Sequence, residues 1–115
     1  MAEDFQLDVE QVAEELKIRP EIYVRIVKSF SETLREKLVI LTQAVTARDT
    51  ETMRKVLHEI KGTAGNLRLR GVSEAEAVMH NDVKDTAATD KILPELAALK
   101  NASEKLTRFV SQYSN

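Results

Sequence analysis

The chain has 115 residues, 43% hydrophobic and 31% charged, and a formal net charge of −2. This size suits one domain with a modest core, the absence of cysteine excludes disulfides and thiolate metal sites, and the charge gives no reason to expect nucleic-acid binding. No apolar stretch approaches a membrane span, and the acidic residues 1–4 lack the layout of a signal peptide, so we expect a single cytoplasmic domain over residues 1–115 without membrane contact.

The N-terminal half predicts a short helix followed by a long one. Asp8 can cap the short helix, whose apolar residues between positions 9 and 16 repeat at helical spacing. Residues 17–19 break this pattern, and Pro20 is expected to open the second helix, because proline is favoured at the first helical position. The second helix carries an apolar stripe with spacings of three and four: Ile22, Ile26, Val27, Phe30, Leu34, Leu38, Leu41 and Val45.

A third helix is expected after an interruption at residues 48–50, where Asp49 or Thr50 can act as the cap. We expect it to end within residues 68–71, with Gly71 as the stop. Its apolar stripe consists of Met53, Val56, Leu57, Ile60, Ala64 and Leu67.

Two further helices complete the expected pattern. Ser73 and Glu76 have the spacing of a capping box, which predicts the start of a fourth helix that runs through Ala77, Val78 and Val83. Residues 85–90 are the most loop-like stretch, and Pro94 limits where a fifth helix can start. The apolar residues of the fifth helix are Leu93, Leu96, Leu99, Leu106, Phe109 and Val110.

Short connections between long amphipathic helices favour antiparallel neighbours. The sequence therefore predicts an all-α fold, an antiparallel up-down-up-down four-helix bundle, with the short first helix as a cap over one end. We find no internal repeat and no low-complexity segment, and we expect a monomer.

The third helix is expected to carry an unusual stripe opposite its core face. At about 100° per residue, His58 lies roughly 140° from Met53 in the middle of the apolar stripe, Gly62 roughly 180° and Gly65 roughly 120°. His58 should therefore face solvent, with Lys61 and Gly62 one turn on and Arg54 one turn back. Glycine inside a helix costs about 1 kcal/mol relative to alanine, so the bare strip indicates a need for open space beside His58.

This arrangement suits a nucleophile that another protein must reach. A neutral imidazole nitrogen can attack phosphorus and carry the phosphoryl group as a phosphoramidate. Lys61 and Arg54 can offset the charge of that group, and the metal for phosphoryl transfer can come from the partner. No glycine-rich phosphate loop is present, so we expect this chain neither to bind ATP by a P-loop nor to act as a kinase alone. We also expect it to have no phosphatase site of its own and therefore not to be an enzyme.

Residues 58–67, with the sequence HEIKGTAGNL, resemble the signature of histidine-containing phosphotransfer (HPt) domains, and the resemblance extends across nearly the whole chain. It implies a phosphoryl carrier in a multistep phosphorelay, in which His58 accepts a phosphoryl group from a receiver-domain aspartate or passes one to it. It further implies that Lys61 holds the phosphoryl oxygens and that Gly62 admits the receiver. The implied partners are response-regulator receiver domains and a hybrid histidine kinase. The resemblance also implies that the domain has no cofactor of its own and that the receiver supplies Mg²⁺.

The resemblance also implies a docking surface around the histidine. Its candidate contacts are Arg54, Leu57, Gly65 and exposed parts of the second helix. One departure is Arg68, where the family commonly has glycine. Periodicity places Arg68 near the edge of the Lys61 side of the helix, where an added positive charge can narrow the choice of partner.

Two alternatives stay open from the sequence. The chain can be a non-catalytic adaptor bundle, which accounts for the apolar stripes but not for the pairing of His58 with Lys61. It can also be the phosphoacceptor domain of a chemotaxis-type kinase. We interpret His80 as a structural or solvated residue, and we reject a metal site formed by His58 and His80 because supporting ligands are missing.

Overall fold

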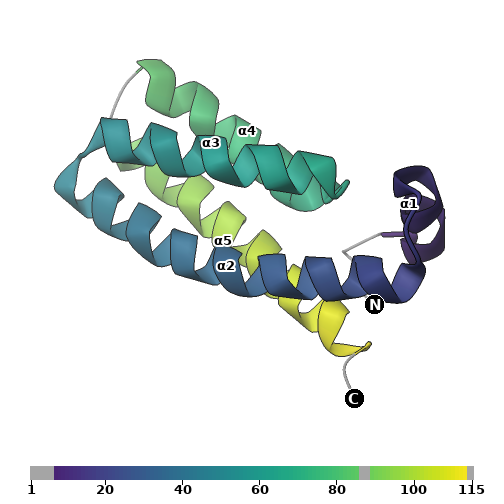
Figure 1. The fold of residues 1–115 in the computed structure, drawn as a ribbon. Coiled ribbons are helices and arrows are strands. Elements are labelled where there is room, and N and C mark those ends of the chain that lie inside the picture. Colours follow the sequence, from purple (N-terminus) through teal and green to yellow (C-terminus); the bar gives the residue numbers. More distant parts are fainter. Residues whose placement is uncertain (1–6, 86–88, 114–115) are drawn as a thin grey trace.

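The computed structural model describes residues 7–85 and 89–113, which form five α-helices and no strand (Figure 1). This confirms the all-α class. Within this part of the chain, no helix is long and apolar enough to cross a membrane. The helices are α1 (Val9–Leu16), α2 (Pro20–Ala47), α3 (Thr50–Asn66), α4 (Arg70–Asp85) and α5 (Thr89–Ser111).

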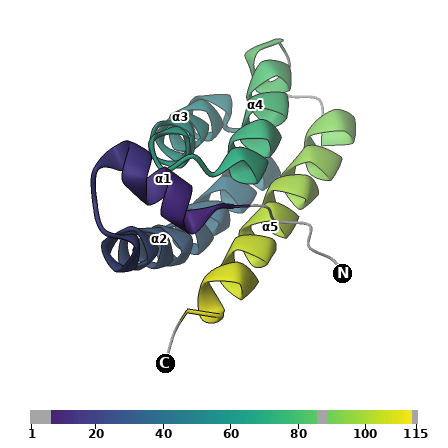
Figure 2. The same cartoon turned by 90° about the vertical axis from the view of Figure 1, so that its right-hand side faces the viewer.

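Local signals at the N-terminal end act as the sequence predicts. The Asp8 side chain accepts a hydrogen bond of 3.1 Å from the backbone N–H of Gln11 and so caps α1. Lys17 ends α1 in the left-handed conformation, with φ of 62°, and Pro20 is the first residue of α2. Helix α1 lies across the end of the molecule where α2 begins (Figures 1 and 2).

The four longer helices pack around one core. Helix α2 contacts α3 and α5, and α4 contacts the same two helices, while α1 contacts α2. Each fully buried large aliphatic side chain contributes about 1.5–3 kcal/mol relative to an exposed one, and all four longer helices supply such residues. The largest fully buried apolar side chains are Tyr23, Leu34, Leu41, Met53, Leu57, Ile60, Leu69, Met79, Ile92, Leu99 and Leu106.

The connection from α3 to α4 differs from the prediction. Helix α3 ends at Asn66, and Arg68 adopts the left-handed conformation with φ of 62°, which reverses the chain in a few residues. Helix α4 then begins at Arg70, so Gly71 lies inside it and is not a stop. The predicted capping box of Ser73 and Glu76 was also wrong. The Ser73 N–H donates to the Leu69 carbonyl oxygen at 3.0 Å, so Ser73 already lies within the first turn of α4 and does not cap it.

A buried hydrogen bond fixes this connection to α2. The Tyr23 hydroxyl donates to the Leu67 carbonyl oxygen at 2.6 Å, and the Tyr23 side chain is fully buried. Burial raises the pKa of Tyr23 to about 12, against an opposing effect of Arg68, so the phenol keeps its proton and remains a donor. The Leu67 carbonyl oxygen, which has no helical partner at the end of α3, therefore has a hydrogen-bond donor in Tyr23.

Three large apolar residues that the sequence analysis names in the predicted helices are exposed. Ile26 is 42% exposed, and Val78 and Leu93 are each 54% exposed. The buried face of these helices is narrower than the apolar pattern. Val27, which belongs to the predicted stripe, is buried beside Ile26, and Met79 and Ile92 are buried beside Val78 and Leu93. Helix α5 begins at Thr89 and includes Pro94. Since α4 ends at Asp85, both helices extend into the stretch at residues 85–90 that was predicted as a loop. Positions 86–88 of that stretch lie outside the described residues.

Candidate functional site

Helix α3 begins at a strong local cap. The Asp49 carboxylate accepts hydrogen bonds from the Thr52 hydroxyl at 2.7 Å and from the Thr52 N–H at 3.1 Å. These bonds, above all the one from the hydroxyl, hold the pKa of Asp49 below its ordinary value. The predicted stripe from Met53 to Leu67 is buried throughout, which fixes the rotation of α3 about its axis.

The opposite side of α3 forms what we call the outward face, which consists of Arg54, His58, Lys61, Gly62 and Gly65. All five residues are exposed, so the predicted orientation of His58 is confirmed. Within residues 7–85 and 89–113, the imidazole makes no hydrogen bond and no ion pair. Its ring nitrogens are therefore open to an approaching group.

The two glycines of the outward face are not required by packing. A methyl group built at Gly62 or at Gly65 meets no atom within 4 Å. Neither residue has a positive φ that would need glycine. Each nonetheless destabilises the helix by about 1 kcal/mol relative to alanine. The bundle alone therefore gives no reason for glycine at these two positions.

On the α2 side of His58, the charges are paired. Lys37 of α2 donates to the Glu59 carboxylate of α3 at 2.7 Å. This hydrogen bond and the charge of Lys37 lower the pKa of Glu59. The contact joins the two helices next to His58 and leaves Glu59 engaged away from the outward face.

On the α4 side, Lys61 borders a small cavity of about 170 Å³ that it shares with Glu76, Ala77, His80 and Asn81. Glu76 is only 1% exposed, and its Oε2 lies 2.8 Å from His80 Nδ1. Sequence reasoning missed this pair, because it assigned Glu76 to a capping box and treated His80 alone. The spacing of four residues between a carboxylate and a histidine on one helix was the signal that could have found it.

Two of the candidate docking residues do not lie on the outward face. Leu57 is fully buried, so it is not a surface contact. Arg68 lies beyond the helix, where periodicity no longer applies, and it reaches toward α1 instead of the Lys61 side. Its Nη1 donates to the Asn66 carbonyl oxygen at 3.1 Å, and its Nε lies 3.6 Å from a Glu15 carboxylate oxygen.

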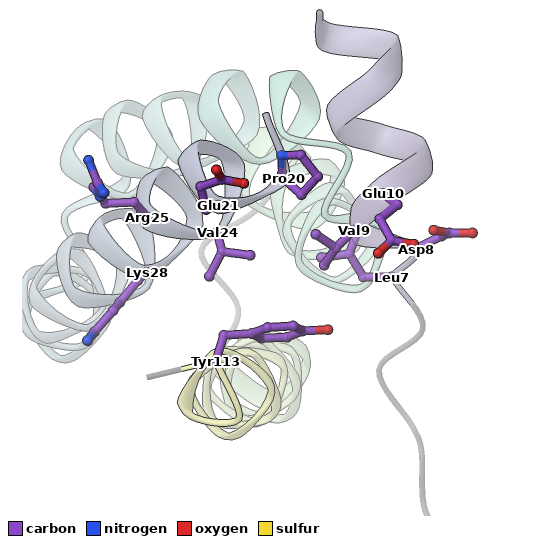
Figure 3. A pocket seen from close by; sticks show the side chains of 10 residues that line it. All are labelled: Leu7, Asp8, Val9, Glu10, Pro20, Glu21, Val24, Arg25, Lys28 and Tyr113. Carbon is purple, nitrogen blue, oxygen red and sulfur yellow. The ribbon is translucent and has the colours of Figure 1, made fainter. Parts of the chain in front are cut away.

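A larger cavity, of about 730 Å³, lies away from this site. It is formed by the start of α1, the first turns of α2 and Tyr113, and no α3 residue lines it (Figure 3). Figure 3 shows the Val24 side chain pointing toward the ring of Tyr113. This cavity is therefore separate from the outward face of α3.

Comparison with protein families decides the classification of the chain. The family described as Hpt domain matches residues 25–108, which extend from within α2 to within α5. This chain belongs to the Hpt domain family. Hpt domains carry out histidine phosphotransfer in phosphorelays, as phosphocarriers that interact with receiver and kinase components. Neither curated proteins nor solved structures give a match.

Proposed function

We propose that this Hpt domain carries a phosphoryl group on His58 and exchanges it with receiver-domain aspartates. The observation that carries the proposal is the outward face of α3. It combines an exposed imidazole with an exposed lysine one turn away and two glycines that packing does not require. An adaptor that binds through α3 without accepting phosphate has no need for this combination.

The proposed transfer forms one bond and breaks one. The lone pair of the unprotonated His58 nitrogen attacks the phosphorus of a receiver aspartyl phosphate, and an N–P bond forms. The P–O bond to the aspartate breaks, and its electron pair leaves with the receiver carboxylate. The proton on the opposite ring nitrogen carries the positive charge of the ring until solvent accepts it. The reverse sequence returns the group to a receiver.

Charge compensation is the main contribution of this chain besides the nucleophile, since phosphoryl transfer relies on positioning and electrostatics. Lys61 is the first candidate, because it is exposed on the same face one turn after His58. Arg54 lies one turn before His58 and can contact the receiver or the phosphoryl group. In this proposal the receiver supplies Mg²⁺, and this domain needs no cofactor of its own.

The glycines provide clearance for the partner. Open space above Gly62 and Gly65 lets a receiver active site approach the imidazole closely. We further propose that the domain is an antiparallel up-down-up-down four-helix bundle with α1 as the cap over one end. It acts as a cytoplasmic monomer and presents one α3 surface to both a hybrid kinase and a downstream receiver.

The test is transfer of labelled phosphate from a phosphorylated receiver domain in the presence of Mg²⁺. We expect acid-labile, alkali-stable label on the wild type and none on His58→Gln, which retains a polar side chain on the exposed helix surface. Equal labelling of the two proteins would overturn the assignment. Receiver binding without any label on the wild type would favour an adaptor. Label from ATP through a kinase domain, but never from a receiver, would indicate a chemotaxis-type phosphoacceptor.

A further inference from the structure

The pair of Glu76 and His80 is a second charged feature beside the outward face. Glu76 is 1% exposed, and the only partner found for its carboxylate within the described residues is His80 Nδ1 at 2.8 Å. A buried carboxylate is unfavourable unless a hydrogen-bond donor or a positive charge compensates it. His80 supplies that compensation from one helical turn away.

Lys61 is the nearby group that competes for the same carboxylate. It lines the same cavity as Glu76 and His80, across the contact between α3 and α4. Its long flexible side chain ends in three donors, and a carboxylate with little solvent around it attracts an ammonium group more strongly than an exposed one. Yet no carboxylate oxygen in the described part of the chain lies within 4.0 Å of the Lys61 ammonium.

We propose that His80 is a positioning residue for Lys61. By occupying the Glu76 carboxylate, it keeps the Lys61 ammonium out of an ion pair with Glu76 and available to the phosphoryl group on His58. This inference rests on the proposed function. It differs from a purely structural role for His80, because it makes the importance of His80 depend on the charge of Glu76.

That dependence predicts a rescue. His80→Ala removes the donor, Glu76 captures Lys61, and the maximal rate of transfer to His58 falls about tenfold. Glu76→Gln removes the negative charge and keeps the shape, so it leaves the rate near that of the wild type. In the double variant the charge that would capture Lys61 is absent, and the rate returns to the wild-type level.

A conservative variant separates the hydrogen bond from the imidazole. The side-chain amide of His80→Asn can take the place of the Nδ1–H that faces Glu76, so this variant should transfer at nearly the wild-type rate. Glu74→Gln is the matched control for loss of charge, because Glu74 is an exposed residue of α4 that pairs with Arg70 at 3.8 Å and does not line the cavity. It should leave the rate unchanged.

The experiment measures single-turnover transfer from a phosphorylated receiver over a range of receiver concentrations. The effect of His80→Ala should appear in the maximal rate and not in the half-saturating concentration, and urea unfolding should establish that each variant is folded. If His80→Ala does not fold, His80→Leu replaces it, since leucine fills the space without a donor. A double variant as slow as the single one, or a single variant as fast as the wild type, would overturn the inference. A wild type that accepts no label would instead overturn the proposed function.

Discussion

Among the described residues, the lysine on the α2 side of His58 forms an ion pair, whereas the lysine on its α4 side does not. Toward α2, Glu59 and Lys37 form an interhelical ion pair at 2.7 Å. Toward α4, Lys61 has no carboxylate within ion-pair distance among the described residues, and the Glu76 carboxylate, which lines the same small cavity, contacts His80 Nδ1. One side of α3 is therefore joined to α2 by an ion pair, whereas the other keeps the positive charge of Lys61 available beside His58, the proposed nucleophile.

Removing the lysine on each side of His58 in turn tests this difference most directly. We expect Lys61→Ala to slow transfer about 100-fold, the usual effect of losing one group that stabilises a transition-state charge. Lys37→Ala should change the rate less than about twofold and lower the free energy of unfolding only slightly, since the pair is partly exposed. Single-turnover transfer and urea unfolding measure both effects. Equal rates for the two variants would contradict the distinction between the two sides.

A second prediction concerns the glycine strip between these two sides. Gly62→Ala should raise the free energy of unfolding by up to about 1 kcal/mol, because the methyl group meets no neighbour and alanine favours the helix. The same methyl group projects from the outward face and should reduce transfer from the receiver about tenfold. Measuring stability and transfer on one sample separates docking from folding. A more stable variant with an unchanged rate would show that Gly62 does not serve access.

Helix α4 makes a second contact between titratable groups, with α5. There Asp82 faces Glu95 of α5, and burial together with a hydrogen bond to Asp82 and its charge raises the pKa of Glu95 from 4.5 to about 7. Between these values the folded state keeps a proton that the unfolded chain releases, so stability should fall as the pH rises through 7. Allowing for solvent screening, we expect a decrease of roughly 1–2 kcal/mol.

Glu95→Gln should remove most of this pH dependence and should be more stable than the wild type at pH 8. Urea unfolding at pH 5.5 and pH 8 measures the difference, with Glu104→Gln on the exposed side of α5 as the control. The idea fails if the wild type and Glu95→Gln lose stability in parallel over this interval.

The smallest expected effect lies at the end of α3. Arg68→Gly should relieve about 1–2 kcal/mol of left-handed backbone strain but lose an exposed ion pair with Glu15 that contributes about 0–1 kcal/mol. We therefore expect a net gain in unfolding free energy of about 0.5–1 kcal/mol. Glu15→Gln isolates the ion pair in the same urea measurement. A net loss would mean that the contacts of Arg68 with α1 outweigh the strain.

The structure also explains why glycine would suit position 68, the position at which the sequence analysis noted a departure from the family signature. A left-handed residue with φ of 62° is easiest for glycine, and this chain places arginine there. The sequence suggested instead that Arg68 lies on the Lys61 side, because the helical period was extended past the true end at Asn66. Periodicity describes a face only while the helix continues.

The sequence by itself determined that the chain forms five helices, the cap at Asp8 and the direction in which His58 points, and it narrowed the cap of α3 to Asp49 or Thr50. These features depend on interactions within a few residues or on the period of one helix, so a single chain segment contains them. The tertiary structure decided that Ile26, Val78 and Leu93 are exposed and that Arg68 reaches α1. It also placed Lys61 beside Glu76 and His80. Such features depend on which face of a neighbouring helix lies opposite, and the period of one helix carries no information about its neighbour.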